Sequence, residues 1–248
     1  KITEEVLPEF RQFSDSFNQM LERLDEGFTA QRQFTGNAAH ELRTPLALMQ
    51  AQVELFSAEH PDVLPETADF LRLLREQTER MTQMTRTLLE MCGLQAVPCT
   101  DHIELGPMID EIFADLAPLA EKNNVMLERE GDGTMTGSDT LIYRLLFNLT
   151  ENAIKYNRPG GSVRLSVTPE PEKLLIRVSD TGPGIPERFQ RSIFQPFFRV
   201  DKSRSREYGG VGLGLSLVWE IVKLHGGTVC VENSSEAGTT VAVSLPLR

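Results

Sequence analysis

Four polar side chains share one face of a predicted helix over residues 145–156, and their chemistry suits a magnesium–nucleotide complex. Asn148, Asn152, Lys155 and Tyr156 recur at steps of three and four residues, which places them on one side of a helix. Asparagine oxygens are hard ligands of the kind that Mg²⁺ prefers. The Lys155 ammonium can meet a phosphate, and Tyr156 offers a flat surface for a base. A helix with a merely polar exposed face is the alternative that these residues alone leave open.

The segment that begins at Asp180 follows a predicted strand and has the composition of a turn beside a flat ligand. A carboxylate at the end of a strand can accept a hydrogen bond from an exocyclic amine such as adenine N6. Gly182 and Gly184 flank Pro183, and they let the backbone turn close to such a ligand. An ordinary Gly-Pro turn would have the same sequence, so that alternative also stays open.

A glycine-rich run at Gly209, Gly210, Gly212 and Gly214 opens the next predicted helix, with Leu215 close behind. Glycines permit close approach, and free backbone N–H groups together with the helix dipole attract phosphate oxygens. No Gly-Lys-Ser/Thr follows the run, and no strand leads directly into it. It is therefore neither a Walker loop nor a Rossmann fingerprint.

Residues 187–208, between these two glycine segments, are partly apolar and locally basic. They contain six basic and three acidic residues, a net charge of +3 in a chain whose total is −11. A cationic segment flanked by glycines suits a mobile lid over a polyphosphate. A solvated charged loop is the alternative.

A separate candidate lies nearer the N-terminus, where His40 is followed by Glu41, Thr44 and Pro45 within a predicted helix. Pro45 has no N–H for the carbonyl of Glu41 and its ring clashes with that carbonyl, at a cost of about 3 kcal/mol. The helix should therefore bend or loosen near His40. Thr44 lies one turn from His40 on the same face. A core histidine beside a helix-ending proline remains possible on this pattern alone.

Helical periodicity dominates the chain around His40. Apolar residues at heptad spacing over 10–34 predict a coiled-coil seam, and the helix is expected to continue through Pro45 to Phe56. Two prolines in residues 59–65 predict a turn, and a second amphipathic helix is expected over 65–92. Because such a hairpin cannot cover both apolar faces, we expect two copies to pair into a four-helix bundle, and hence a homodimer.

After a lapse in the pattern, the chain changes to mixed helix and strand. Helices are expected over 107–123, 140–155 and 213–224, and strands at 126–128, 162–167, 174–179, 228–231 and 239–245. The predicted fold class is α+β multidomain. An antiparallel helical hairpin forms a dimeric four-helix bundle and is followed by an α/β sandwich with one mixed sheet and helices on one face.

Composition limits the alternatives. The 248 residues are 40% hydrophobic and 25% charged, as in a globular protein. No apolar run reaches the length of about 18 residues that a membrane span needs, so we expect neither a span nor a secretory signal within this chain. A net charge of −11 argues against nonspecific nucleic-acid binding. Cys92, Cys99 and Cys230 show no metal-like grouping and indicate reduced thiols.

The remaining histidines are expected to be structural or incidental. His60 and His102 fall in predicted loops. His225 precedes a Gly-Gly helix end, where a cation would be tolerated.

Taken in order, the five motifs resemble the H, N, G1, F and G2 boxes of the sensor histidine kinases of two-component systems. The first box resembles the subfamily that writes it His-Glu-x-x-Thr-Pro, and residues 238–247 resemble the family's last strand. The resemblance covers roughly residues 10–248. It implies a signalling helix at the end of a HAMP-like linker (1–33), a dimerisation and histidine phosphotransfer hairpin (34–93), a linker (94–102) and a Bergerat-type (GHKL) ATP-binding catalytic domain (103–248).

The resemblance also implies roles for individual residues of the first box. His40 matches the phosphoacceptor, and Glu41 matches the acid that activates it. A carboxylate that accepts one ring N–H fixes the tautomer and raises the basicity of the other nitrogen. Thr44 matches the residue that helps position water when the partner protein is dephosphorylated.

The nucleotide boxes imply ATP and Mg²⁺ as cofactors, held by residues on four segments. Asn152 and Asn148 match the metal-associated positions, with Asn152 the stronger candidate for direct coordination. The other matches are Lys155 for a phosphate, Tyr156 for an adenine-side wall, Asp180 for adenine N6, Gly182, Gly184, Gly210, Gly212, Gly214 and Leu215 for the shape of the pocket, and Arg199 and Lys202 for the lid.

The implied activity is that of an ATP:protein-histidine phosphotransferase. The γ-phosphoryl group of Mg·ATP would pass to His40 and then to an aspartate on the receiver domain of a response regulator, which the protein would also dephosphorylate. The chain would be the cytoplasmic portion of a protein anchored in the bacterial membrane through N-terminal segments absent from it. The alternative is an ATP-gated interaction module or ATPase of the GHKL superfamily. Such ATPases lack the histidine box and carry a Glu near the position of Asn148.

Overall fold

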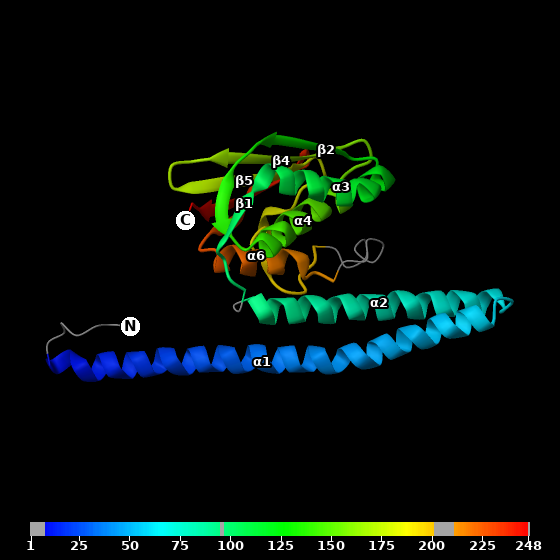
Figure 1. The fold of residues 1–248 in the computed structure, drawn as a ribbon, viewed down its shortest axis with the longest axis horizontal. Coiled ribbons are helices and arrows are strands. Elements are labelled where there is room, and N and C mark those ends of the chain that lie inside the picture. Colours follow the sequence, from blue (N-terminus) through cyan, green and yellow to red (C-terminus); the bar gives the residue numbers. More distant parts are fainter. Residues whose placement is uncertain (1–7, 95–96, 201–210, 248) are drawn as a thin grey trace. The chain divides into compact units, whose positions relative to one another are not determined.

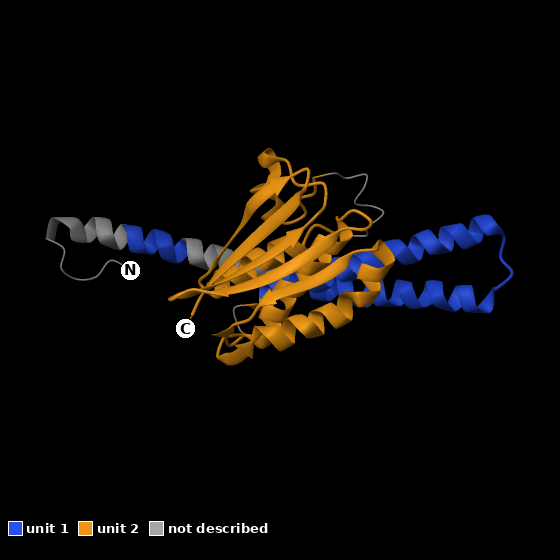
Figure 2. Ribbon diagram, turned by 90° about the horizontal axis from the view of Figure 1, so that it is seen from above, with its two compact units in different colours: residues 1–92 blue, residues 93–248 orange. Residues whose placement is uncertain are grey.

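The computed structural model describes residues 8–94, 97–200 and 211–247, without the side chains of residues 8–16 and 24–34. The chain divides into two compact units, Lys1–Cys92 and Gly93–Arg248 (Figure 2). Each unit has its own architecture. None of the helices in the described part of the chain is both long enough and apolar enough to cross a membrane.

Unit 1 is a pair of long helices, α1 (Pro8–Glu59) and α2 (Pro65–Gly93), which confirms the predicted hairpin. The helix α1 runs without interruption through Pro45. Figure 1 shows that α1 changes direction along its length, its C-terminal part running at an angle to the rest. A proline inside a helix is a recognised cause of such a bend, because a backbone hydrogen bond is lost there.

Many large apolar side chains of the hairpin are exposed in the single chain. They include Leu42, Leu48, Met49, Leu55, Phe56, Leu64, Phe70, Leu73, Leu74 and Met81. Soluble proteins rarely leave an apolar surface of this extent open to water. The hairpin therefore presents the surface that a second copy would need, and the dimer stays a prediction.

Unit 2 combines helices and strands. Its described helices are α3 (Leu105–Asn123), α4 (Asp139–Lys155) and α6 (Gly214–Leu224), with short 3₁₀ turns η2 (Glu187–Phe189) and η3 (Ser192–Phe194). Its described strands are β1 (Asp101–Glu104), β2 (Met126–Gly131), β3 (Thr134–Gly137), β4 (Ser162–Pro169), β5 (Lys173–Asp180), β6 (Thr228–Ser235) and β7 (Gly238–Pro246). Each helix and strand predicted for this part of the chain is present, and the strands are longer than predicted.

Five strands form a mixed sheet in the order β2-β4-β5-β7-β6. The β2–β4 pair is parallel and the other pairs are antiparallel. Figure 1 shows α3, α4 and α6 together on one face of this sheet. Alternate residues of β4 and β5, such as Leu165 and Ile176, are fully buried, as are Ile142 and Leu146 of α4. The predicted mixed sheet with helices on one face is confirmed.

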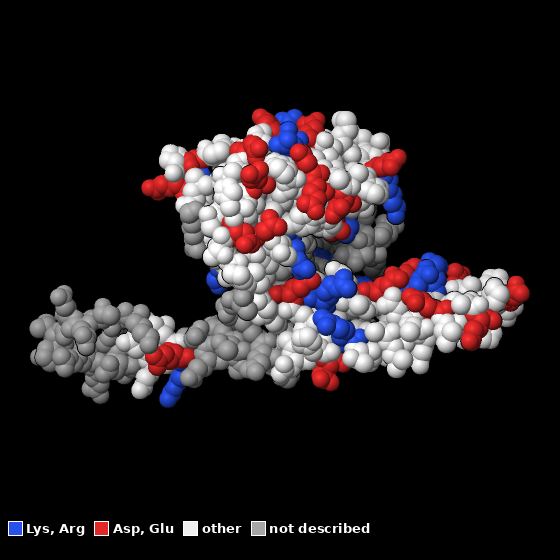
Figure 3. Space-filling view, viewed as in Figure 1, with Lys and Arg blue, Asp and Glu red and all other residues white. Residues whose placement is uncertain are grey.

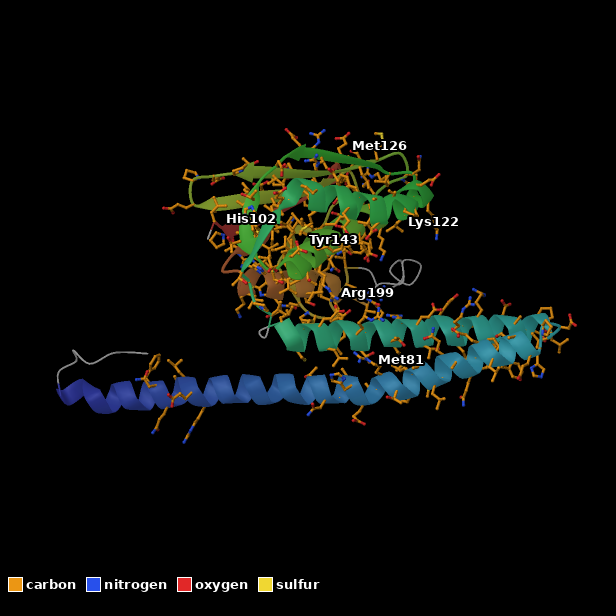
Figure 4. The ribbon with its side chains drawn as sticks, in the orientation of Figure 1. Met81, His102, Lys122, Met126, Tyr143 and Arg199 are labelled. Carbon is orange, nitrogen blue, oxygen red and sulfur yellow. The ribbon has the colours of Figure 1, made fainter. Side chains whose placement is uncertain are left out.

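Surface interactions tie the elements of unit 2 together. The Tyr143 hydroxyl of α4 donates a 2.5 Å hydrogen bond to Asp115 of α3, and burial together with that bond raises the pKa of Tyr143 to about 12. Figure 4 labels Tyr143 among the helices of this unit. Figure 3 shows acidic side chains spread over the visible face of unit 2, with basic side chains interspersed among them.

The predicted loop around His102 is wrong. His102 lies in β1, opposite Thr136 of β3, in a separate two-stranded antiparallel sheet. Ile103 is the buried residue of this four-residue strand. Alternation cannot be recognised from a single buried side chain, so the periodicity of the sequence does not reveal β1. His60, by contrast, lies outside the helices as predicted.

Candidate functional site

The polar face predicted on α4 exists, and the opposite side of the helix is buried. Leu145 and Leu149 are buried, whereas Asn148 and Asn152 are only partly exposed. The Nδ2 of Asn148 donates a 2.7 Å hydrogen bond to the carbonyl of Arg144, one turn earlier. That bond orients the amide, because Nδ2 donates to a backbone carbonyl of the helix and Oδ1 points elsewhere, where it can accept from or bind another partner.

The first residue of α6 lies directly against this face. A Cβ added to Gly214 would lie 2.9 Å from Asn148 Oδ1 and 3.7 Å from Asn152 Nδ2. A larger residue would therefore press on the Asn148 amide and would touch the Asn152 amide. The structure thus brings together the asparagine face and the glycine run, which are separated by more than fifty residues in the sequence.

The donor set of this junction fits Mg²⁺. The described residues contain no group of three or more His, Cys, Asp or Glu side chains that could hold a metal. The amide oxygens of Asn148 and Asn152 are hard donors, and Gly214 leaves the Asn148 oxygen uncovered. Few protein donors suffice for Mg²⁺ beside a nucleotide, because phosphates and water complete its octahedron.

Asp180 ends β5 with one carboxylate oxygen already engaged. Its Oδ1 accepts hydrogen bonds from the N–H groups of Gly182 at 2.8 Å and Thr239 at 3.2 Å. Among the described residues, none donates to Oδ2. Burial raises the pKa of Asp180, and the two backbone N–H groups oppose that shift. The carboxylate is therefore held in place with a second oxygen that can accept a hydrogen bond from a ligand.

Two glycines let the loop after Asp180 pack between its neighbours. A Cβ on Gly182 would lie 2.6 Å from the carbonyl oxygen of Tyr156, at the end of α4. Gly184 has a φ of 79°, and a Cβ there would overlap the carbonyl of Ser235. The loop thus brings Asp180 beside the C-terminal end of α4, where Tyr156 is exposed.

Lys155 is not a free cation in the structure. Its Nζ forms a 2.8 Å ion pair with Glu151, one turn earlier on α4. A phosphate would have to replace or share this partner. Sequence reasoning missed Glu151, although an acid four residues before a lysine on a helix is a known pairing signal.

The described part of the predicted lid is joined to the glycine run. The N–H of Phe197 donates a 2.8 Å hydrogen bond to the carbonyl of Gly212, and Gly212 has a φ of 80° that favours glycine. Leu215 follows in the first turn of α6, partly exposed. Lys202 and Gly210 lie outside the described residues.

Arg199 is the described basic residue of the lid region that sequence analysis singled out. Its Nε and Nη2 atoms are buried and have no hydrogen-bond partner among the described residues. Figure 4 labels this side chain. Buried guanidinium donors without a partner suit an anion, because charge-assisted bonds to phosphate would satisfy them.

Sequence reasoning also missed the residues that support the Asp180 loop from β6 and β7. Ser234 Oγ accepts a 2.7 Å hydrogen bond from the N–H of Ile185 and lies 3.0 Å from Thr239 Oγ1. Thr239 in turn donates its N–H to Asp180. The bonds from Ile185 to Ser234 and from Thr239 to Asp180 join positions 49 and 59 residues apart, and no local pattern in the sequence predicts them.

In unit 1, His40 is exposed on α1 in the single chain. Ala39 and Leu46 are the buried side chains of this stretch, whereas His40, Glu41 and Thr44 are exposed. No hydrogen bond between His40 and Glu41 is present in the described part of the chain, since successive helical residues do not face each other. The roles of His40, Glu41 and Thr44 stay predictions.

Comparisons with known families divide the chain in the same way. Residues 30–92 match the His Kinase A (phospho-acceptor) domain. Residues 137–248 match the Histidine kinase-, DNA gyrase B-, and HSP90-like ATPase family. The first match contains His40, and the second contains the asparagine face, the Asp180 loop and the start of α6. The fold and the site therefore define a phospho-acceptor hairpin joined to an ATPase domain of the histidine kinase type.

Similar whole proteins narrow the assignment. Sensor histidine kinase RppB of Synechocystis is 33% identical over 228 residues, which cover 90% of this chain and 50% of RppB. Signal transduction histidine-protein kinase ArlS of Staphylococcus aureus is 31% identical over 245 residues, covering 95% of this chain and 53% of ArlS. This chain thus spans about half the length of these curated relatives. The chain belongs to the sensor histidine kinase family.

A solved structure has the same fold across both units. The crystal structure of full-length ShkA in complex with AMPPNP aligns with a TM-score of 0.69 and 20% sequence identity. The alignment covers 86% of this chain and 45% of ShkA. A helical region followed by an α/β domain is therefore an architecture that this chain shares with a known protein.

Proposed function

We propose that this chain binds Mg·ATP in unit 2 and transfers its γ-phosphoryl group to His40 of unit 1. The observation that carries the proposal is the contact of Gly214 with Asn148 and Asn152. It sets a helix N-terminus, which attracts phosphate, against two metal-type donors. The chain that holds this junction also holds an exposed histidine in a phospho-acceptor domain.

The adenine base would lie at the Asp180 end of this site. Asp180 Oδ2 accepts a hydrogen bond from the exocyclic amine, while the two backbone N–H groups hold Oδ1 still. Tyr156, exposed at the end of α4, lies beside the same loop and covers the base. A site whose acceptor is fixed before binding loses little freedom when the ligand arrives.

The triphosphate would extend from the base toward the start of α6. Backbone N–H groups of the first turn of α6 receive phosphate oxygens, and Lys155 exchanges Glu151 for a phosphate. Mg²⁺, held by Asn152 and Asn148, supplies neutralisation of charge on the phosphates. Arg199 contributes a further cation through the donors that lack a partner in the structure.

Phosphoryl transfer requires the two units to come together. The lone pair of one imidazole nitrogen of His40 forms the P–N bond, and the bond from the γ-phosphorus to the bridging oxygen breaks as ADP leaves. The proton on the other ring nitrogen passes to Glu41 or to water. Neutral imidazole is the nucleophilic form of histidine, because its unprotonated nitrogen carries the lone pair.

The phosphohistidine would then serve a partner protein. An aspartate on the receiver domain of a response regulator accepts the phosphoryl group, and Thr44, one turn from His40, positions water when the regulator is dephosphorylated. We infer that the active species is a homodimer, because the exposed apolar side chains of the hairpin need a partner surface. Anchoring to a membrane would come from segments outside this chain.

Replacing the phosphoacceptor tests this proposal most directly. His40→Gln should abolish incorporation of label from ATP labelled at the γ-phosphorus, while Mg·ATP binding persists. The wild-type label should be labile to acid and stable to base, and it should map to His40. His60→Gln is the matched control, because it replaces another exposed histidine of unit 1. This variant should still incorporate label at His40. Label retained by His40→Gln would remove His40 from the mechanism.

A further inference from the structure

His225 ends α6, is only 3% exposed, and uses both of its ring nitrogens. Its Nδ1 lies 2.8 Å from the carbonyl oxygen of Ile221, so Nδ1 carries the hydrogen. Its Nε2 accepts a 3.1 Å hydrogen bond from the N–H of Ser138, so Nε2 carries none. The bonds select a neutral ring in one tautomer. The sequence led us to expect that a cation would be tolerated at this position, and that expectation is wrong. A cationic ring would carry a hydrogen on Nε2 as well, and two N–H donors would then face each other at Ser138.

The partner of His225 is the start of α4. Ser138 is the N-cap residue of α4, and its carbonyl accepts hydrogen bonds from Leu141 and Ile142. Gly137, the last residue of β3, lies so close that an added Cβ would be 3.1 Å from Nε2 and Cδ2 of His225. The ring therefore joins the end of α6 to the point where β3 passes into α4.

The helices α4 and α6 thus meet at two defined points and run antiparallel. The start of α6 touches the second half of α4, where Gly214 meets Asn148 and Asn152. The end of α6 touches the beginning of α4 through His225 and Ser138. The eleven residues of α6 span about 16 Å at 1.5 Å per residue.

The buried side chains of α6 between these two points are mainly apolar, with Ser216 as the polar exception. Leu217, Val218 and Ile221 of α6 are buried, and burial of apolar surface has no strong directional preference. A hydrogen bond to a ring nitrogen does have one, because it weakens steeply away from linearity. The His225–Ser138 bond is therefore suited to set the rotation and register of α6 along α4.

We propose that His225 is a positioning residue for the phosphate end of the nucleotide site. By holding α6 in register with α4, it keeps the N–H groups at the start of α6 opposite Asn148 and Asn152. This inference rests on the proposed binding of Mg·ATP. The adenine end should not depend on it, because the hydrogen-bond partners of Asp180 are Gly182 and Thr239, and neither belongs to α6.

Two amide variants separate the two bonds of the ring. His225→Asn can still donate to Ile221 from a position near Nδ1, but its side chain is too short to reach Ser138. His225→Gln is one methylene longer and can place an oxygen near the position of Nε2. The two variants have similar polarity but keep different bonds. A larger loss of Mg·ATP affinity in His225→Asn than in His225→Gln therefore assigns the effect to the bond to Ser138 rather than to the bond to Ile221.

The test compares binding of Mg·ATP with binding of adenosine by isothermal titration calorimetry, with every chain in a His40→Gln background. His225→Asn should lower the affinity for Mg·ATP about tenfold, which corresponds to about 1.4 kcal/mol of binding free energy. Its affinity for adenosine should stay within about twofold of the value for native His225. His225→Gln should recover most of the loss. The thermal unfolding temperature of each variant is measured as well, to show that each variant is folded at the temperature of the titration.

Tyr143→Phe is the control for a general loss of stability. It removes the bond between α4 and Asp115 of α3 without touching α6, so the ratio of the two affinities should not change. Equal loss of ATP and adenosine affinity in His225→Asn, or no loss of either, would overturn the role of His225. Failure of the His40→Gln chain with native His225 to bind Mg·ATP would instead overturn the proposed function.

Discussion

The helical hairpin and the α/β unit of this chain differ in how far their apolar side chains are buried. In unit 2, Ile142 and Leu165 have no exposed surface, and a continuous core lies between sheet and helices. In unit 1, Leu48 is 60% exposed and Phe70 is 58% exposed. Burial of apolar surface is the main favourable term in folding. Unit 2 therefore has a buried core of its own, whereas unit 1 leaves much of its apolar surface open in the single chain.

The two units differ in the same way at their candidate sites. In unit 2, Asp180 is held by two backbone N–H groups, and Gly214 lies against the oriented amide of Asn148. In unit 1, His40 is exposed, and no bond to Glu41 fixes its ring among the described residues. Under the proposed function this difference is expected, because a nucleotide site benefits from a prepared geometry, whereas a phosphoacceptor histidine needs access to the nucleotide and to a partner protein.

The largest expected effect concerns the core of unit 2. Ile142→Ala should lower the free energy of unfolding by about 3 kcal/mol, because it removes buried methylenes and leaves a cavity. Urea denaturation followed by circular dichroism measures this change. Leu48→Ala, at an exposed position of unit 1, is the comparison and should change unfolding of unit 2 by less than about 0.5 kcal/mol. Similar losses in both variants would break the contrast between the units.

The next effect concerns association of the hairpins. Phe70→Glu should weaken dimerisation at least about tenfold, since burying a phenylalanine is worth roughly 1.5–3 kcal/mol. Analytical ultracentrifugation over a range of concentrations measures it. Arg72→Ala, on the same helix, removes only exposed ion pairs to Asp69 and Glu76 and should have little effect. A dimer of unchanged affinity in Phe70→Glu would show that this face is not the interface.

The smallest effect separates stability from binding at Asp180. Because burial raises its pKa, the folded state favours the protonated carboxyl. Protonated Asp180 therefore contributes to the free energy of unfolding below the pKa of the unfolded state, and this contribution is lost as pH rises through the higher pKa of the folded state. At neutral pH the ionised side chain therefore costs stability, and Asp180→Asn should leave the free energy of unfolding unchanged or slightly higher.

The same substitution should weaken adenosine binding about tenfold. The amide can keep its oxygen toward Gly182 and Thr239, but it then presents an NH₂ group where a ligand amine needs an acceptor. Chemical denaturation and calorimetric titration measure the two quantities. A variant that loses stability and keeps its affinity would show that Asp180 is structural.

Much of the architecture was readable from local sequence patterns. Heptad and amphipathic periodicity predicted α1 and α2, and alternation predicted β4 and β5, because a single buried face imposes its own period on the residues that form it. The same logic found the face of Asn148 and Asn152. The order of the motifs identified the family before any contact was known.

Tertiary structure alone decided which of these residues meet and in what state. Thr239 holds Asp180, and Ser138 selects the tautomer of His225. The residues of each pair are far apart in the sequence, so no periodicity connects them. The strand β1 was missed for the same reason, since its stability comes from pairing with β3. Sequence alone determined the face on which each side chain lies, because backbone geometry is local. Its partner depended on the folded chain, because packing brings distant segments together.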